Sequence, residues 1–206
     1  MPNFNNCNIG ISLNNNSSAF FTTPVVMKDI KNTAIVLSNN SLLAHAGVSG
    51  STGSSFNIFD SKRGIQIQNN SRVDVENADI RKVQYGLVCL NSSSFDFNKS
   101  IIDGGSFYTS FTGQAYGMYV SDNSTGNIFQ SSITGYTGGT GSLTSGNIAV
   151  VKSSVLFVGT TADSLRVNTV ALGSSMIGEV YVDPTFGQKL VGGDSVAYDI
   201  PVQGEM

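Results

Sequence analysis

Residues 64–75 read GIQIQNNSRVDV, and this pattern decides the fold because it recurs along the chain. It consists of a small residue, two apolar residues at alternate positions, a polar corner ending in serine, and two more alternating apolar residues. Apolar residues that alternate with polar ones have the period of a β-strand. Each copy therefore predicts two short strands joined by a polar corner. Further copies begin at Gly10, Ala34, Leu87, Gly117 and Asn147.

One column of the aligned copies is invariant, because each copy has a serine directly after its polar corner. These residues are Ser17, Ser41, Ser71, Ser93, Ser124 and Ser154, with successive serines 22 to 31 residues apart. The column two residues earlier is mostly asparagine and holds Asn15, Asn39, Asn69, Asn91, Asp122 and Lys152. Asparagine tolerates left-handed backbone, and its amide can hydrogen-bond to an amide stacked above it. We therefore expect an asparagine ladder beside the serine column.

The spacing of the copies predicts a solenoid, because it is too short for a βαβ unit and too regular for a sandwich of hairpins. We expect an all-β fold, a right-handed parallel β-helix of about six to seven coils, since parallel crossovers take the right hand. The apolar positions of each copy should form continuous inward columns, and a third side of the coil is marked by Ile80, Ile102 and Ile133.

The domain organisation follows from where the pattern holds. Residues 1–160 should form the parallel β-helix coils, and residues 161–206 a last irregular coil or a β cap. Extra Gly, Ser and Thr predict loops at Gly47–Phe59, Gly104–Ala115 and Gly135–Ser145. No amphipathic helix precedes the first coil, so we expect an excised fragment or a stack that another chain continues.

Composition excludes several partners. Eleven Lys and Arg against fourteen Asp and Glu give a net charge of −3, with no basic cluster for nucleic acid. The sequence contains no run of eighteen apolar residues, so we expect no membrane span. Cys7 and Cys89 form no CxxC pair and are expected to be free thiols. We expect no cofactor and no metal site.

The asparagine ladder, the serine column and the Gly-apolar-any-apolar strand opening resemble the right-handed parallel β-helix domains of phage tail spikes, tail fibres and baseplate proteins, and of the wider pectate-lyase-like superfamily. The resemblance covers roughly residues 8–160. It implies a homotrimer in a virion tail or on an extracellular surface, in contact with other virion proteins and with a cell-surface glycan. Because one scaffold hosts many activities, the resemblance identifies architecture more specifically than function.

Three functions fit such a scaffold. The first is a noncatalytic structural or receptor-recognition module, a rigid stalk that displays loops for attachment to a host surface. The second is a polysaccharide-degrading enzyme, either a lyase or a glycoside hydrolase. The third is a bacterial surface adhesin.

Two acidic residues are the sharpest catalytic candidates. Asp74 and Asp96 fall in one outward column of neighbouring coils, so their side chains should lie about 5 Å apart. This separation suits a retaining glycosidase or a cation bridge. Asn127 follows in the same column, and outward polar residues between buried apolar ones also solvate an ordinary strand. The only histidine, His45, falls in an inward column and is expected to be a core or corner residue.

Aromatic residues gather in and beside the two later loops. They are Phe107, Tyr108, Phe111, Tyr116, Tyr119 and Tyr136. Aromatic faces are the surfaces that sugar-binding grooves use, which makes these residues candidates for binding. The alternative is that they hold the loops against the coil.

Overall fold

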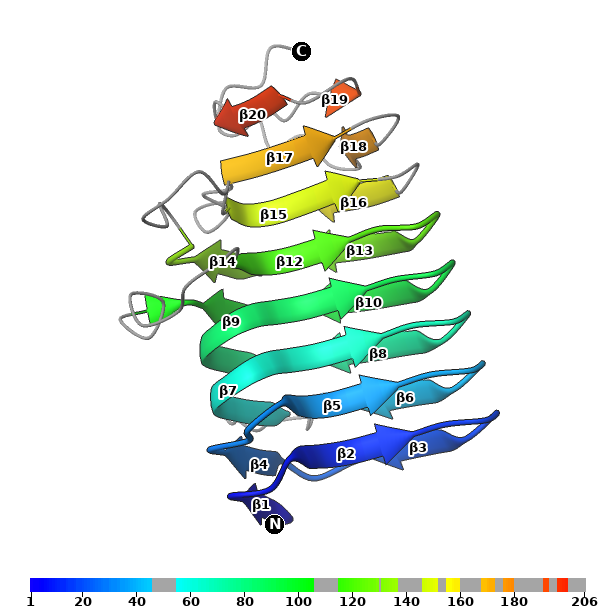
Figure 1. The fold of residues 1–206 in the computed structure, drawn as a ribbon, viewed down its shortest axis with the longest axis vertical. Coiled ribbons are helices and arrows are strands. Elements are labelled where there is room, and N and C mark those ends of the chain that lie inside the picture. Colours follow the sequence, from blue (N-terminus) through cyan, green and yellow to red (C-terminus); the bar gives the residue numbers. More distant parts are fainter. Residues whose placement is uncertain are drawn as a thin grey trace.

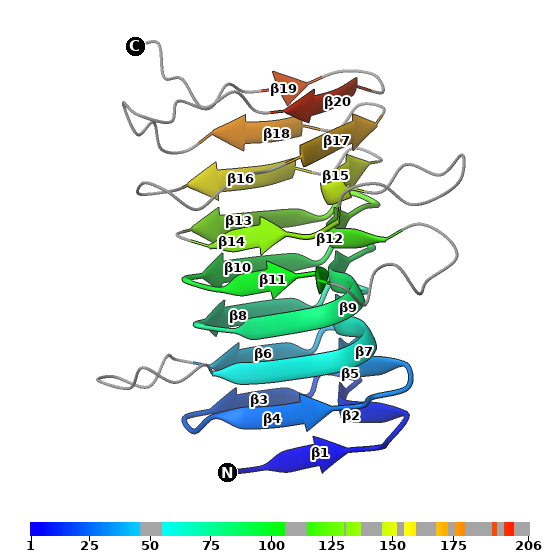
Figure 2. The same cartoon turned by 90° about the vertical axis from the view of Figure 1, so that its left-hand side faces the viewer.

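The structure is a computed structural model that describes residues 1–45, 55–105, 115–129, 131–136, 146–151, 155–159, 168–172, 176–179, 191–192 and 196–199. Within these residues the fold is all-β, and the strands form one sheet of twelve strands and one of eight. Figures 1 and 2 show the strands stacked in layers along the long axis of the molecule. No helix in the described residues has the length and apolarity needed to cross a membrane.

The twelve-stranded sheet covers two sides of the stack. Two long strands, β7 (Phe56–Ile67) and β9 (Asp79–Cys89), curve from one side to the other (Figures 1 and 2). On one of these sides the strand order is β1 (Asn3–Asn5), β4 (Val25–Lys28), the first halves of β7 and β9, β11 (Ile101–Asp103) and β14 (Ser132–Thr134). On the other side the strand order is β2 (Ile9–Leu13), β5 (Thr33–Leu37), the second halves of β7 and β9, β12 (Tyr116–Val120), β15 (Gly146–Val151), β17 (Asn168–Leu172) and β20 (Val196–Asp199).

The eight-stranded sheet forms the remaining side. Its strands are β3 (Ser18–Phe21), β6 (Leu42–His45), β8 (Arg72–Glu76), β10 (Ser94–Asn98), β13 (Thr125–Phe129), β16 (Val155–Gly159), β18 (Met176–Glu179) and β19 (Val191–Gly192). Parallel pairing continues past residue 160 through β17 and β18. The antiparallel strands β19 and β20 follow them at the carboxyl end.

The first predicted loop, Gly47–Phe59, ends earlier than the sequence suggested, because Phe56–Phe59 belong to β7.

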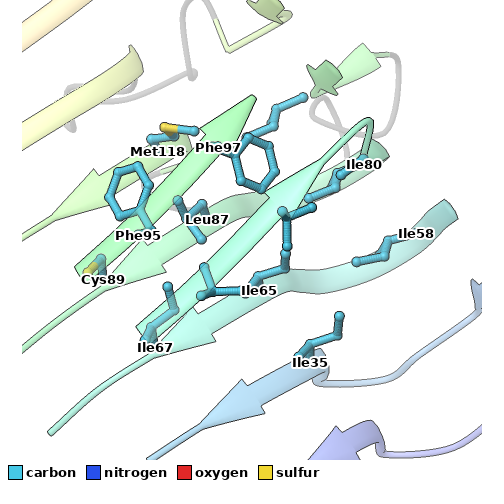
Figure 3. Close-up of a cluster of buried hydrophobic side chains, with 14 of the residues drawn as sticks. Ile35, Ile58, Ile65, Ile67, Ile80, Leu87, Cys89, Phe95, Phe97 and Met118 are labelled. Carbon is cyan, nitrogen blue, oxygen red and sulfur yellow. The ribbon is translucent and has the colours of Figure 1, made fainter. Parts of the chain in front are cut away.

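The register places equivalent apolar residues of successive layers directly over one another. Figure 3 shows part of this core. The fully buried columns include Ile35, Ile65, Leu87, Met118 and Ile148 on one side, and Met27, Ile58, Ile80, Ile102 and Ile133 on another. Within the described side chains these predicted inward columns are thus confirmed, and Ile80, Ile102 and Ile133 form one buried column, as predicted. Parallel strands about 4.8 Å apart bring like side chains into contact and exclude water from the interior.

The polar corner between the two sheets has the same backbone in every described layer. Its first residue has φ between 55° and 58°, and the next has φ between 59° and 62°, so two consecutive residues are left-handed. The pairs are Asn15 and Asn16, Asn39 and Asn40, Asn69 and Asn70, Asn91 and Ser92, and Asp122 and Asn123. This conformation costs most side chains free energy, and asparagine tolerates it better than most. The predicted asparagine preference therefore has a backbone cause.

The asparagine side chains also connect the layers. Asn91 Nδ2 donates to Asn69 Oδ1 at 2.9 Å, and Asn69 Nδ2 donates to Asn39 Oδ1 at 3.0 Å. Asn39 Nδ2 in turn donates to Asn14 Oδ1 at 2.7 Å and, in a longer contact, to Asn15 Oδ1 at 3.4 Å. These contacts form the predicted ladder over the first four layers. Lys152 lies outside the described residues.

The serine column satisfies backbone donors that the turn leaves over. The Ser41 N–H donates to Ser71 Oγ at 3.1 Å, the Ser71 N–H to Ser93 Oγ at 3.2 Å, and the Ser93 N–H to Ser124 Oγ at 3.3 Å. These four serines are buried. A buried N–H without an acceptor destabilises the fold, and each serine hydroxyl supplies the acceptor for the serine N–H of the preceding layer. Ser17 is partly buried at the first layer, and Ser154 lies outside the described residues.

A second serine column occupies another corner. The Ala78 N–H donates to Ser100 Oγ at 2.9 Å, and the Ser100 N–H donates to Ser131 Oγ at 3.0 Å. The residue before each donating N–H is again left-handed, with φ of 59° at Asn77, before Ala78, and 47° at Lys99, before Ser100. The same device thus recurs where the aligned sequence copies had not indicated it.

Replacing Ser93 by alanine should destabilise the fold by about 1–3 kcal/mol, because the buried Ser71 N–H would lose its acceptor. The loss is measured by urea unfolding. Ser94→Ala is the matched control, since Ser94 is the next residue, is only partly buried and belongs to no serine column. Equal stability losses in the two variants would contradict the role given to the column.

In one inward column a large residue meets a glycine of the next layer. Phe95 on β10 pairs with Gly126 on β13, and a β-carbon built on Gly126 would lie 2.1 Å from the Phe95 ring. The Phe95 ring is 1% exposed and fills the space that a side chain at position 126 would take. The glycine is therefore required by packing rather than by backbone conformation.

Gly126→Ala should destabilise the fold by about 1–3 kcal/mol through overpacking. Adding Phe95→Leu should recover part of that loss, because the smaller side chain vacates the contested space. Urea unfolding of both single variants and the double variant gives the coupling between the two positions. Strictly additive effects would show that the ring and the glycine do not share this space.

Candidate functional site

A groove lies on the outer surface where β7, β9 and β12 run side by side. Its volume is about 270 Å³, and its lining consists of Arg63, Gln66, Tyr85, Val88, Leu90, Tyr116 and Tyr119. This volume is near the lower end for small-molecule sites, roughly 300–1,000 Å³. The groove therefore suits one small ring or a short segment of a larger ligand.

The groove results from outward positions of three successive layers. The register aligns Arg63 with Tyr85 and Tyr85 with Tyr116, which makes one outward column. Gln66, Val88 and Tyr119 make a second. Because neighbouring strands are about 4.8 Å apart, rings at equivalent positions must lie close together.

The tyrosine rings form a connected aromatic surface. The ring centroids of Tyr85 and Tyr116 are 6.3 Å apart, and those of Tyr116 and Tyr119 are 5.5 Å apart. Tyr116 is only 2% exposed and lies at the base, while Tyr85 and Tyr119 are partly exposed. Burial raises the pKa of Tyr85; the Arg63 guanidinium opposes this shift, and Tyr119 adds to it. Tyr85 therefore offers a neutral hydroxyl, and both Tyr85 and Tyr119 offer partly exposed ring faces to a ligand.

Arg63 is fixed at one end of the groove. Its Nη1 donates to Asn32 Oδ1 at 2.9 Å, and its guanidinium carbon lies 5.8 Å from the centroid of the Tyr85 ring. The first contact sets the direction of the side chain, and the second is a cation–π contact. A guanidinium has five N–H donors, so others remain for a ligand.

The structure separates the aromatic candidates. Tyr116 and Tyr119 line the groove. Tyr136 is fully buried, and burial followed by the charge of Asp103 raises its pKa above the ordinary range. Its ring therefore packs inside the protein and presents no face to a ligand, which corrects its assignment as a binding residue. Phe107, Tyr108 and Phe111 lie outside the described residues.

Sequence reasoning missed five residues of the groove, namely Arg63, Gln66, Tyr85, Val88 and Leu90. They occupy outward positions, where the repeat imposes no residue type. The available signal was that Tyr85 stands two residues before the apolar position Leu87, as Tyr116 stands two before Met118. Extending the aligned copies by two residues toward the amino terminus would have placed both rings in one column.

Asp74 and Asp96 are register partners on β8 and β10, and Asp96 is followed by Asn127 on β13. The Asp96 carboxylate forms an ion pair with Arg72 and accepts a hydrogen bond from Asn127 Nδ2 at 2.5 Å. The two carboxylates lie on the eight-stranded sheet, whereas the groove lies on the other sheet. Polar neighbours on the same outer face thus satisfy Asp96.

The single histidine is a core residue, as its inward column predicted. His45 is 2% exposed, and its Nε2 lies 3.0 Å from the Thr23 carbonyl oxygen. Its ring stacks near Phe21 and meets Phe56 edge-on, with centroids 6.4 and 5.0 Å away. Among the described residues, no group of three or more His, Cys, Asp or Glu side chains is placed to hold a metal ion.

Both cysteines are free thiols, as expected from their separation. Cys89 lies in the core, and burial raises its pKa to about 12. Because the thiolate is the reactive form, Cys89 has the character of a packing residue.

Comparisons with known proteins give no relative from which function can be transferred. No protein-family model, curated protein or solved structure matches the chain. Its function must therefore be argued from its own residues.

Proposed function

We propose that the stacked sheets form a right-handed parallel β-helix. Support comes from the strand order, in which the chain visits each side in turn and then pairs in parallel with the preceding layer. The left-handed corners and the continuous inward columns repeat with the same period. The right hand follows from the strong general preference of parallel crossovers.

We further propose that this chain is a noncatalytic structural and receptor-recognition module of a phage tail spike, tail fibre or baseplate. A dry core with bonded layers makes the body rigid, so the outer surface can keep a binding site in fixed geometry. The observation that carries recognition is the tyrosine groove, with its aromatic faces, Arg63 and Gln66. Such a surface fits a saccharide of a host cell.

The contents of the groove favour binding over catalysis. Glycoside hydrolases typically use a pair of carboxyl groups, one on each side of the glycosidic bond. None of the described residues that line the groove is acidic. The acidic pair of Asp74 and Asp96 belongs to the other sheet. A polysaccharide-degrading enzyme remains the competing function that an assay must test.

A homotrimer is part of this proposal. Phe20 and Leu42 lie on the neighbouring strands β3 and β6, and their side chains are 64% and 41% exposed. Large apolar side chains exposed on neighbouring strands of one sheet face are typical of protein interfaces. Three copies in contact along this side would cover them.

The purified chain should have a mass in solution close to three times the 21.7 kDa of one chain, measured by light scattering. On a glycan array it should bind host-surface saccharides without shortening them, as judged by the length of the recovered glycan. A monomer would contradict the trimer. Depolymerised glycan that disappears in the Asp96→Asn variant would establish the enzyme instead.

A further inference from the structure

The arginines of the described residues differ in one respect. Arg72 forms an ion pair with Asp96, and Arg81 forms one with Asp79. Arg63 pairs with no carboxylate of the described residues, and it contacts the neutral Asn32 side chain and the Tyr85 ring. It is also the only charged side chain among the described residues that line the groove.

The position of Arg63 makes this difference meaningful. The side chain is partly buried, and Asn32 and Tyr85 hold it from two directions. Ordering an arginine costs side-chain entropy, and partial burial removes part of its hydration. A carboxylate of a ligand would supply the two parallel hydrogen bonds that a guanidinium fork forms best.

The rest of the groove indicates what carries that carboxylate. Tyr85 offers a partly exposed aromatic face next to the guanidinium, Tyr119 offers a second face in the same groove, and the Gln66 amide lies in the adjacent column. A saccharide ring has an apolar face that packs on an aromatic ring, and it has hydroxyls that bond to amides and phenols. The volume of about 270 Å³ accommodates a small unit of this kind rather than a folded partner.

We propose that the groove binds an acidic saccharide, with the sugar ring against Tyr119 and Tyr85 and its carboxylate on Arg63. This inference rests on the proposed recognition function and names its ligand class. The net charge of −3 makes nonspecific attraction of anions unfavourable, so binding of an acidic sugar would have to come from the local site.

The test uses the full chain and four monosaccharides, namely glucuronate, galacturonate, mannuronate and N-acetylneuraminate. Each is titrated beside its own methyl ester, with tyrosine ring resonances followed by NMR. At least one acid should bind about tenfold or more tightly than its ester, because only the acid can pair with the guanidinium. Glucose 6-sulfate, which carries an anion of different shape, should bind more weakly than that acid.

Two variants locate the site. Arg63→Gln should weaken binding of the acid by about tenfold or more and remove the preference over the ester. Arg72→Gln removes the same charge on the other sheet and should change binding by less than about twofold. Thermal unfolding checks that both variants remain folded.

Binding of ester and acid with equal affinity, equal effects of the two arginine variants, or no acid bound at millimolar concentration would each overturn the inference. Binding of glucose 6-sulfate as tightly as the best acid would overturn the carboxylate assignment. If neutral saccharides bind on the array while all four acids fail, the recognition function stands and only its ligand class is wrong. If no saccharide binds at all, the recognition function fails as well.

Discussion

The structure depends on a backbone turn that must recur at the same place in every layer. Two consecutive left-handed residues direct the chain from one sheet to the other, and the serine that follows them accepts an N–H from the layer before it. A layer that turned one residue early would reverse the side on which each side chain points. The turn therefore sets the register, and the register sets which residues touch.

The interior and the exterior follow different rules as a result. Inward residues must fit the residue of the next layer, which is why the Phe95 ring is paired with a glycine at position 126. Outward residues can also contact the next layer, but they need not fit a closed interior, so their types can vary more. Arg63, Tyr85 and Tyr119 are outward residues, so the groove could arise without altering the core. This separation lets one rigid body carry a site of almost any chemistry.

How far the sequence could predict the structure depends on this same division. The serine column, the asparagine ladder and the inward columns were predictable, because the register repeats them and a repeat can be aligned. The second serine column was not recognised, since only Ser100 and Ser131 contribute hydroxyls to it and the layer before them has Ala78 at that position. Tyr136 was wrongly placed among the binding residues, because its proximity to a glycine-rich segment gave no sign that it is fully buried.

The groove was predictable only in part for a related reason. Tyr116 and Tyr119 stood out as aromatic residues close to a loop. Arg63 and Tyr85 lie at outward positions, and no repeated residue type marks these positions in the sequence. Their meeting becomes visible only after layers of unequal length are brought into register. A repeat alignment indicates which residues share a column, and coordinates are needed to show that two adjacent columns enclose a groove.

In-register stacking of successive layers can be measured directly by pulsed electron paramagnetic resonance. Spin labels at Ser18 and Thr125, in a Cys7→Ser background, would report on one outward column that passes through Leu42, Arg72 and Ser94. Four steps of about 4.8 Å predict a backbone separation of about 19 Å, with a modest spread from the labels. A main distance beyond about 30 Å would contradict parallel stacking in register and the account built on it.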